Sequence, residues 1–230
     1  HAVGFRTDKN EPVFEIDFIY CHMRNISKKI AGYLLQINAI KLQPSNPFTW
    51  ASGLKAPIYC DNRKILSFPE VRSFIRDAFT DAVKTYYPDV QVIAGIATGA
   101  IAHGVLVAEK MNLPFIYVRS EAMNHGLGNR IEGYFEKGQK VVVIEDLIST
   151  GGTSLGAVKA LRDEGCIVRG MIAIFTYGFQ KAYKKFSDEN CELHTLCDYN
   201  ALIETALGKG YISEAEMEVL KKWRNEMSEL

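Results

Sequence analysis

Two adjacent carboxylates, followed by a short run of hydroxyl and glycine residues, form the stretch of this sequence best suited to chemistry. The segment VVVIEDLISTGGTS at 141–154 carries four apolar residues, then Glu145 and Asp146, then a turn of small residues. Glycine lets the backbone approach an anion closely, and the free amides of a following helix favour negative charge there. The turn is therefore a candidate phosphate site, made of Ser149, Thr150, Gly151, Gly152 and Thr153.

The acid pair has to bind something other than that phosphate, because carboxylates facing it would repel it. Vicinal hydroxyls of a ribose, bound directly or through a metal ion, would suit Glu145 and Asp146, so the stretch indicates a phosphorylated sugar as ligand. The spacing is neither that of the Walker loop, since no lysine follows, nor GxGxxG, which disfavours a nucleotide triphosphatase and a dinucleotide dehydrogenase. A structural interpretation stays open here, in which the acids cap the next turn and the glycines only turn the chain.

Length and composition describe an ordinary globular protein. The 230 residues fit one α/β domain better than two, and 27 basic against 27 acidic residues argue against nucleic-acid binding through bulk charge. No apolar run approaches the roughly 20 residues of a transmembrane helix, and the first residues lack the order of a signal peptide. The five cysteines are scattered without a CxxC pair, which predicts reduced thiols. We therefore expect a cytoplasmic protein without membrane or nucleic-acid partners.

Apolar periodicity predicts the elements that position the candidate site. Residues 1–22 show no clear helical period and are taken as an N-terminal extension of unclear role, while an apolar stripe predicts a helix over 24–42. A loop-rich segment follows at 43–63, and Pro69 fits the first turn of a helix that Pro88 ends. Strands are then predicted at 92–96, 114–118, 141–145, 167–177 and, weakly, 191–196. Helices are predicted at 101–111, 154–165 and 198–207, and a polar loop at 119–139. A capping box of Ser213 and Glu216 predicts the start of a last helix.

Strands without internal polar alternation, separated by helices, predict a parallel sheet covered on both faces. Ligands bind such sheets at the carboxyl ends of the strands. This arrangement places three strand ends on one rim: 95–100, Arg119 onward, and 145–153.

Four segments resemble one enzyme family. The string at 141–153 resembles the phosphoribosyl-pyrophosphate motif of type I phosphoribosyltransferases. FTWASGLKAPIYCDNR at 48–63 looks like the N-terminal signature of orotate phosphoribosyltransferases, and 118–133 looks like their mobile catalytic loop. AIFTYG at 173–178 is also similar, and the resemblance covers roughly 24–210.

The resemblance implies a twisted, mainly parallel sheet flanked by helices, with a small N-terminal hood. Residues 23–230 would form one phosphoribosyltransferase domain, with a hood at about 23–65 plus the C-terminal helices and a core at about 66–200. It implies a glycosyltransferase (pentosyl transfer) of pyrimidine and UMP biosynthesis, which makes orotidine 5′-monophosphate and pyrophosphate from orotate and phosphoribosyl pyrophosphate with Mg²⁺. It also implies a homodimer in which the loop 119–130 completes the neighbouring site.

The family's roles fall on matching positions of this sequence. Glu145 and Asp146 would hold the ribose hydroxyls, and Asp146 would stabilise positive charge on the ring; Mg²⁺ would bind mainly through the substrate, with these acids as candidate ligands. Arg119 and His125 would serve the leaving pyrophosphate as donors. The resemblance assigns the 5′-phosphate to the turn at 149–153. The remaining substrate-binding candidates are Ala97, Thr98 and Gly99 for pyrophosphate, and Lys55 and Tyr59 for orotate.

The sequence also departs from the family pattern. Met123 stands where family loops generally carry a lysine, Ser120 where some members carry another, and the ATGA turn at 97–100 lacks the basic residue that some members have. A methionine cannot neutralise pyrophosphate charge; Lys110, Lys137 and Arg130 are the candidates to compensate. Two alternatives remain: transfer to another base, against which the hood signature argues, and a non-catalytic regulator that binds phosphoribosyl pyrophosphate.

Overall fold

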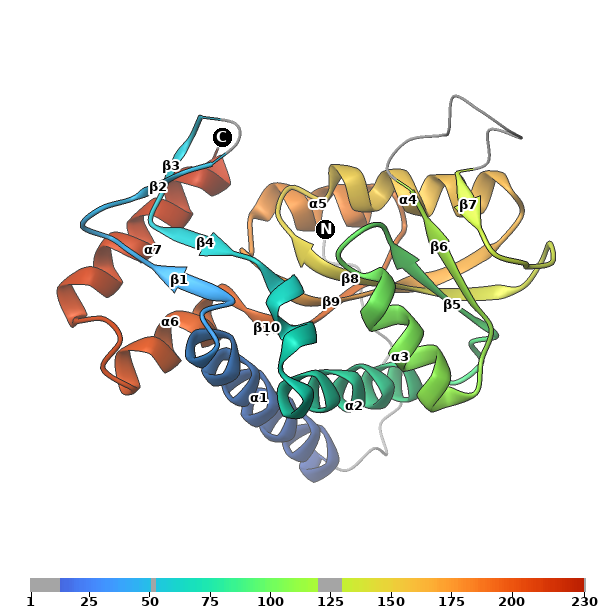
Figure 1. The fold of residues 1–230 in the computed structure, drawn as a ribbon, viewed down its shortest axis with the longest axis horizontal. Helices are drawn as coiled ribbons and strands as arrows, with labels where there is room; N and C mark the ends of the chain where they lie inside the picture. Colours follow the sequence, from blue (N-terminus) through green and yellow to red (C-terminus); the bar gives the residue numbers. More distant parts are fainter. Residues whose placement is uncertain (1–12, 51–52, 120–129, 230) are drawn as a thin grey trace.

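A six-stranded sheet forms the centre of the computed structural model, which describes residues 13–50, 53–119 and 130–229 (Figure 1). The strands lie in the order β10-β9-β8-β5-β6-β7. All neighbouring pairs are parallel except β6 and β7, which are antiparallel. The predicted mainly parallel sheet is thus confirmed. The strand bounds are β5 Val92–Ile96, β6 Phe115–Val118, β7 Ile131–Glu132, β8 Lys140–Ile148, β9 Ile167–Thr176 and β10 Leu193–Asp198.

Both faces of the sheet are buried, which explains why its strands read as continuous apolar runs. Along β8, Val142 and Ile144 belong to a core shared with α2 (Pro69–Tyr86) and α3 (Ile101–Met111). Val141 and Val143 belong to a second core. That second core is shared with α4 (Gly152–Asp163) and α5 (Gln180–Asp188). The alternation fixes the register of β8, because a shift by one residue would exchange the two faces.

The hood lies at the left of Figure 1, beside the C-terminal helices. It contains two short antiparallel pairs, β1 (Ile40–Leu42) with β4 (Ile58–Cys60) and β2 (Phe48–Thr49) with β3 (Lys55–Ala56). The 3-10 helix η1 (Asn62–Ser67) leads from the hood to α2, and α6 (Tyr199–Gly208) and α7 (Glu214–Glu229) close the chain. The ring of Trp50 lies 5.5 Å from that of Tyr177 and 5.9 Å from that of Trp223. This aromatic contact ties the hood to the residue directly after β9 and to α7.

The N-terminal helix differs from the prediction. Helix α1 spans Val13–Gln36, so it begins within the segment set aside as an extension and ends six residues earlier than predicted. Asn38 takes the left-handed conformation with φ 54°, which ends the helical path. The next residues then form β1 by pairing with β4. The stripe that predicted the helix includes Ile37 and Lys41, which lie after the last residue of α1, so the prediction ran past the helix end into a strand.

Other elements also differ from the prediction. Strand β7 lies within the predicted loop 119–139, and α5 was not predicted at all. Strand β8 continues to Ile148, so Asp146 lies within the strand and not after it, and Glu145 is not the last residue of the strand. The capping box is confirmed, because Ser213 N and Oγ both donate to Glu216 Oε2 at 2.9 Å.

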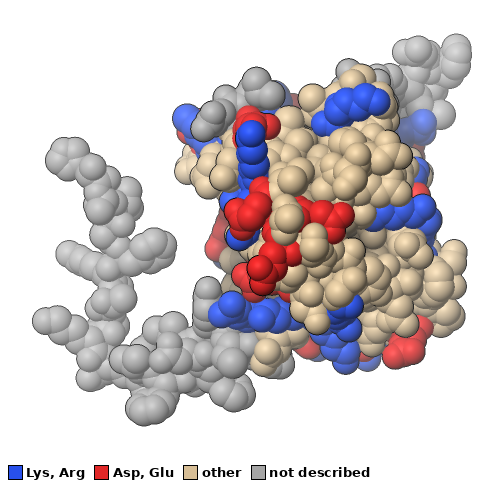
Figure 2. All heavy atoms as spheres, turned by 90° about the vertical axis from the view of Figure 1, so that its left-hand side faces the viewer, with Lys and Arg blue, Asp and Glu red and all other residues tan. Residues whose placement is uncertain are grey.

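The face formed by the hood and the C-terminal helices carries both signs of charge (Figure 2). On α7 the charges pair locally, as in Lys221 with Glu218 and Lys222 with Glu226. In the parts of the chain that the structure describes, no helix is long and apolar enough to cross a membrane.

Candidate active site

A cavity of about 280 Å³ opens at the carboxyl edge of the sheet, where the ends of β5 and β8 meet. It brings together the predicted acid pair, the predicted phosphate turn and the small residues after β5, although 97–99 and 145–153 lie far apart in sequence. The lining residues are Ile96, Ala97, Thr98, Gly99, Glu145, Asp146, Leu147, Ser149, Thr150, Gly151, Gly152, Thr153 and Ser154. This is the edge at which a parallel sheet is expected to bind ligands.

The turn at 149–153 leads directly into a helix. Gly151 is the N-cap of α4 and has φ 76°, a left-handed conformation that glycine adopts without strain. A Cβ there would lie only 2.8 Å from Cε2 of Phe186, so α5 packs tightly against the turn. The first amides of α4 have no partner within the helix, and its dipole adds positive potential. The turn therefore has the geometry of an anion site.

The two acids have different surroundings. Glu145 is 5% exposed, and its Oε1 accepts from Asp146 N at 2.8 Å while its Oε2 accepts from Ser154 Oγ at 2.9 Å. Burial, together with the neighbouring charge of Asp146, raises the pKa of Glu145 well above its ordinary value. Asp146 is only partly buried, and its carboxylate packs against Gly99 so closely that a Cβ there would lie 2.5 Å from Cγ of Asp146. Asp146 is thus the more accessible acid of the pair.

The turn after β5 completes the cavity. Ala97 N donates to Val118 O at 2.8 Å, and the peptide bond between Ala97 and Thr98 is cis. Helix α3 begins two residues after Gly99. Small side chains leave the backbone of this turn facing the cavity, as an anion site requires.

Arg119 lies at the stem of the predicted catalytic loop and not in the cavity lining. Its backbone N–H donates to Arg130 O at 2.9 Å, and Arg130 Nε donates back to Arg119 O at 3.0 Å. Its guanidinium pairs with Glu132 at 3.4 Å, and both side chains are about one-third exposed. His125, Met123 and Ser120 lie outside the described residues. The stem therefore holds Arg119 on the same rim of the sheet as the cavity.

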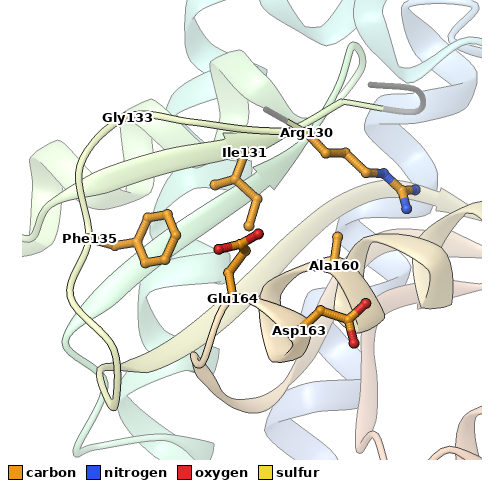
Figure 3. Close-up of a pocket in the computed structure, with 7 residues that line it drawn as sticks. All are labelled: Arg130, Ile131, Gly133, Phe135, Ala160, Asp163 and Glu164. Carbon is orange, nitrogen blue, oxygen red and sulfur yellow. The ribbon is translucent and has the colours of Figure 1, made fainter. Parts of the chain in front are cut away.

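The three candidates to replace the missing loop lysine point elsewhere. Figure 3 shows Arg130 extending over α4 at a second cavity, of about 310 Å³, lined also by Phe135 and Glu164. A Cβ on Gly156 of α4 would lie 3.2 Å from a guanidinium nitrogen of Arg130. Lys110 pairs with Asp77 at 3.8 Å. Lys137 packs against Gly165, where a Cβ would lie 3.0 Å from its Cγ. None of the three lines the candidate active site.

The two predicted orotate residues belong to the hood and do not line the cavity. Lys55 is exposed, and its Nζ donates to Thr49 Oγ1 at 2.7 Å within the β2–β3 pair. Tyr59 is 42% exposed, with its ring 5.7 Å from that of Phe48. In this structure neither Lys55 nor Tyr59 therefore lines the cavity that holds the acid pair.

Sequence reasoning missed three buried polar residues around the acids: Ser154, Asn62 and His103. Asn62 Nδ2 donates to Asp146 O at 2.6 Å across 84 positions of sequence. His103 is 2% exposed, and burial lowers its pKa to about 4, so the ring is neutral at physiological pH. Asn62 lies inside the hood signature at 48–63, which was a usable signal, whereas nothing in the local sequence marks His103.

Replacing Glu145 with glutamine is expected to stabilise the protein increasingly as pH rises. Because the pKa of Glu145 is higher in the folded than in the unfolded state, the folded state binds more protons above the ordinary value of 4.5, and stability falls as pH rises through that window. Glutamine avoids this loss, which amounts to about 1.4 kcal/mol for each unit of pKa difference. Urea denaturation of both proteins from about pH 5 to 8 measures the effect, and parallel stability profiles would contradict the buried-acid argument.

The fold and the site define a class of protein. A phosphate turn that opens a helix, beside an acid pair on the central strand of a parallel sheet, is the arrangement of a phosphoribosyltransferase. The family model described as "Phosphoribosyl transferase domain" matches residues 63–195, more than half of the chain.

Curated relatives show which phosphoribosyltransferases this chain is similar to in sequence. The orotate phosphoribosyltransferase of Porphyromonas gingivalis is 54% identical over 202 residues, which is 88% of this chain and 96% of the relative. The orotate phosphoribosyltransferase of Lactococcus lactis subsp. cremoris is 54% identical over 200 residues, which is 87% of this chain and 96% of the relative. The chain belongs to the orotate phosphoribosyltransferase family.

Solved structures share the fold at lower identity. The orotate phosphoribosyltransferase of Aeropyrum pernix matches with a TM-score of 0.70 and 23% identity, over 80% of this chain and 99% of that one. The UMP synthase of Leishmania donovani matches with a TM-score of 0.76 and 22% identity, over 89% of this chain but only 43% of that one. The observed sheet order and flanking helices thus belong to a known type I phosphoribosyltransferase fold.

Proposed function

We propose that this protein transfers the phosphoribosyl group of 5-phosphoribosyl 1-pyrophosphate to orotate, which yields orotidine 5′-monophosphate and pyrophosphate. It is a glycosyltransferase of the pentosyl class, in the synthesis of UMP. The observation that carries the proposal is the cavity in which the phosphate turn, Asp146 and the turn at 97–99 converge. The hood signature, which lies in a chain 54% identical to orotate phosphoribosyltransferases, supports orotate over another base.

The charges around the cavity suit a reaction in which the ribose ring becomes positive. The bond between the anomeric carbon and pyrophosphate breaks while the bond from that carbon to the orotate nitrogen forms. The 5′-phosphate binds at the amides of the turn 149–153, and Asp146 accepts from the ribose hydroxyls and stabilises the developing positive charge. The Glu145 carboxylate accepts a hydrogen bond from the main-chain N–H of Asp146, which holds Asp146 in place, and Glu145 faces the same hydroxyls. Amides of the turn at 97–99, with Arg119 and His125, take up the charge of the leaving pyrophosphate.

Magnesium fits this donor set as an ion brought mainly by the substrate. Among the described residues, no group of three or more histidine, cysteine or acidic side chains could hold a metal ion. Mg²⁺ commonly binds through one or two carboxylates and substrate phosphates, and Asp146 and Glu145 are the candidates here. When bound, the ion would neutralise charge on the pyrophosphate.

The organisation of the active unit is also part of the proposal. Residues 23–230 act as one phosphoribosyltransferase domain, and two copies form a homodimer in which each loop 119–130 completes the neighbouring site. A backbone bond from Arg119 N to Arg130 O and a side-chain bond from Arg130 Nε to Arg119 O hold the two ends of that loop together at the rim of the sheet. We place the enzyme in the cytoplasm, without nucleic-acid or membrane partners.

Replacing Met123 with lysine is expected to raise kcat about tenfold, because it restores a cation in the loop that serves pyrophosphate. The candidates to substitute for that cation are engaged at other places, as Arg130 is at α4. Steady-state rates at saturating substrates measure the effect, with Met123→Gln as a control of similar length without charge. An unchanged kcat in the lysine variant would show that another residue already fills the role.

The assignment is tested by the ultraviolet absorbance of orotate during incubation with phosphoribosyl pyrophosphate, Mg²⁺ and the purified protein. We expect a Mg²⁺-dependent loss of orotate and a stoichiometric release of pyrophosphate. Adenine and hypoxanthine in place of orotate serve as controls for other bases. Binding of phosphoribosyl pyrophosphate without consumption of orotate would point to the non-catalytic regulator instead.

A further inference from the structure

Two side chains bond to the backbone of Asp146, in the part of β8 that β5 no longer pairs with. Its N–H donates to Glu145 Oε1 at 2.8 Å, and its carbonyl oxygen accepts from Asn62 Nδ2 at 2.6 Å. The sheet register shows where this happens. Strand β5 pairs with β8 only as far as Ile144 and then turns away into the cavity lining. The amide of Asn62 thus supplies a donor to the backbone of β8 beyond the last β5–β8 pair.

Asn62 is itself fixed in place. It is 1% exposed, and its Oδ1 accepts a hydrogen bond from Cys60 Sγ at 3.4 Å. It is the first residue of η1, which follows β4 of the hood and packs against β8. Because Asn62 is buried, it has no surface from which to contact a substrate. Any effect on the reaction has to pass through the residue it holds.

We propose that Asn62 is a positioning residue that sets the direction of the Asp146 carboxylate and so links the hood to the ribose site. The inference rests on the proposed role of Asp146 in transfer to orotate. Gly99 packs against the carboxylate on the cavity side, and Asn62 fixes the main chain from which that carboxylate extends. A displacement of about 1 Å at such a group can cost about 100-fold in rate, because the charge no longer faces the reacting carbon.

The test uses Asn62→Asp, which keeps the size of the side chain but places an acceptor against the Asp146 carbonyl. We expect kcat/KM for phosphoribosyl pyrophosphate to fall about 100-fold, with an unchanged KM for orotate. Thr80→Val is the matched control, since Thr80 is 2% exposed and donates to Arg76 O at 2.9 Å within α2, away from the site. We expect the control to lose stability without a change in kinetics. If Asn62→Asp does not fold, Asn62→Leu, which removes the donor at similar size, takes its place with the same expected loss.

A double-mutant cycle with Asp146→Asn separates positioning from a general structural role. If Asn62 acts through Asp146, adding Asn62→Asp to Asp146→Asn should change the rate by no more than about twofold. The same large loss in both backgrounds would overturn the inference, as would wild-type kinetics in a folded Asn62→Asp protein.

A wild-type protein that consumes no orotate would refute the proposed function but not the positioning role. Calorimetric titration with phosphoribosyl pyrophosphate then decides, because the role predicts weaker binding to Asn62→Asp and the wild-type affinity for Thr80→Val. Equal affinity of Asn62→Asp and wild type in that titration would overturn the inference.

Discussion

Replacing Asp146 with asparagine is expected to lower kcat about 100- to 1,000-fold while the protein stays folded. Asparagine keeps the shape of the side chain and an oxygen that accepts hydrogen bonds, but it removes the negative charge beside the ribose ring. Of the two acids, Asp146 is the accessible one, while Glu145 has both oxygens occupied by Asp146 N and Ser154 Oγ. The reaction separates charge, so the accessible carboxylate should carry most of the electrostatic stabilisation.

Stability should move the other way in the same variant. The charge of Asp146 is one cause of the raised pKa of Glu145, so its removal makes ionisation of Glu145 less costly in the folded state. We therefore expect a free energy of unfolding at neutral pH that is equal to or above that of the wild type. A loss of activity together with a loss of stability would instead indicate damage to the strand.

Saturating steady-state rates and urea denaturation measure the two quantities on the same preparations. Asp81→Asn is the matched control, because Asp81 is an exposed acid on α2 and its replacement changes the net charge equally. We expect this control to behave as the wild type. Near-wild-type turnover of Asp146→Asn would remove the acid pair from the mechanism.

The sequence predicted those parts of the site that lie at the ends of neighbouring strands. The strand 92–96 and the helix 101–111 have the predicted bounds, because a buried strand and an amphipathic helix carry strong local patterns. The turn that connects this strand to this helix lies beside the turn after β8, because neighbouring parallel strands end at the same edge of the sheet. The candidate site residues at 97–99 and 145–153 therefore line one cavity, as predicted.

The parts that were not predicted depend on contacts between distant segments. Helix α5 is amphipathic, with Ala182 and Phe186 buried one turn apart, but its nine residues hold little more than two turns of that pattern. The bond from Asn62 to Asp146 links positions 84 apart in the sequence. It forms just beyond Ile144, the last residue of β8 that pairs with β5. The bond by which Ser154 satisfies the buried Glu145 is likewise signalled by no spacing rule. Local patterns specify elements, whereas the support of the catalytic acid is a property of the assembled sheet.

Replacing Gly99 with alanine is expected to lower kcat/KM for phosphoribosyl pyrophosphate about 100-fold, with little change in stability. An added Cβ would lie 2.5 Å from Cγ and 2.8 Å from Oδ1 of Asp146, and it would also meet Oδ2. The backbone of Asp146 cannot yield, because Asn62 and Glu145 hold its carbonyl and its N–H. The carboxylate therefore has to rotate away from the ribose, and the variant reproduces part of the Asp146→Asn defect without removing the charge.

The matched control is Gly208→Ala, because Gly208 is the last residue of α6 and a Cβ there meets nothing within 4 Å. Alanine should be neutral or slightly stabilising in that helix, by up to about 1 kcal/mol. In a folded Gly99→Ala protein, wild-type kinetics would mean that the carboxylate reaches the ribose from more than one rotamer. The defect expected here requires one fixed direction, which follows from a glycine on one side of the carboxylate and an amide of the hood on the backbone behind it.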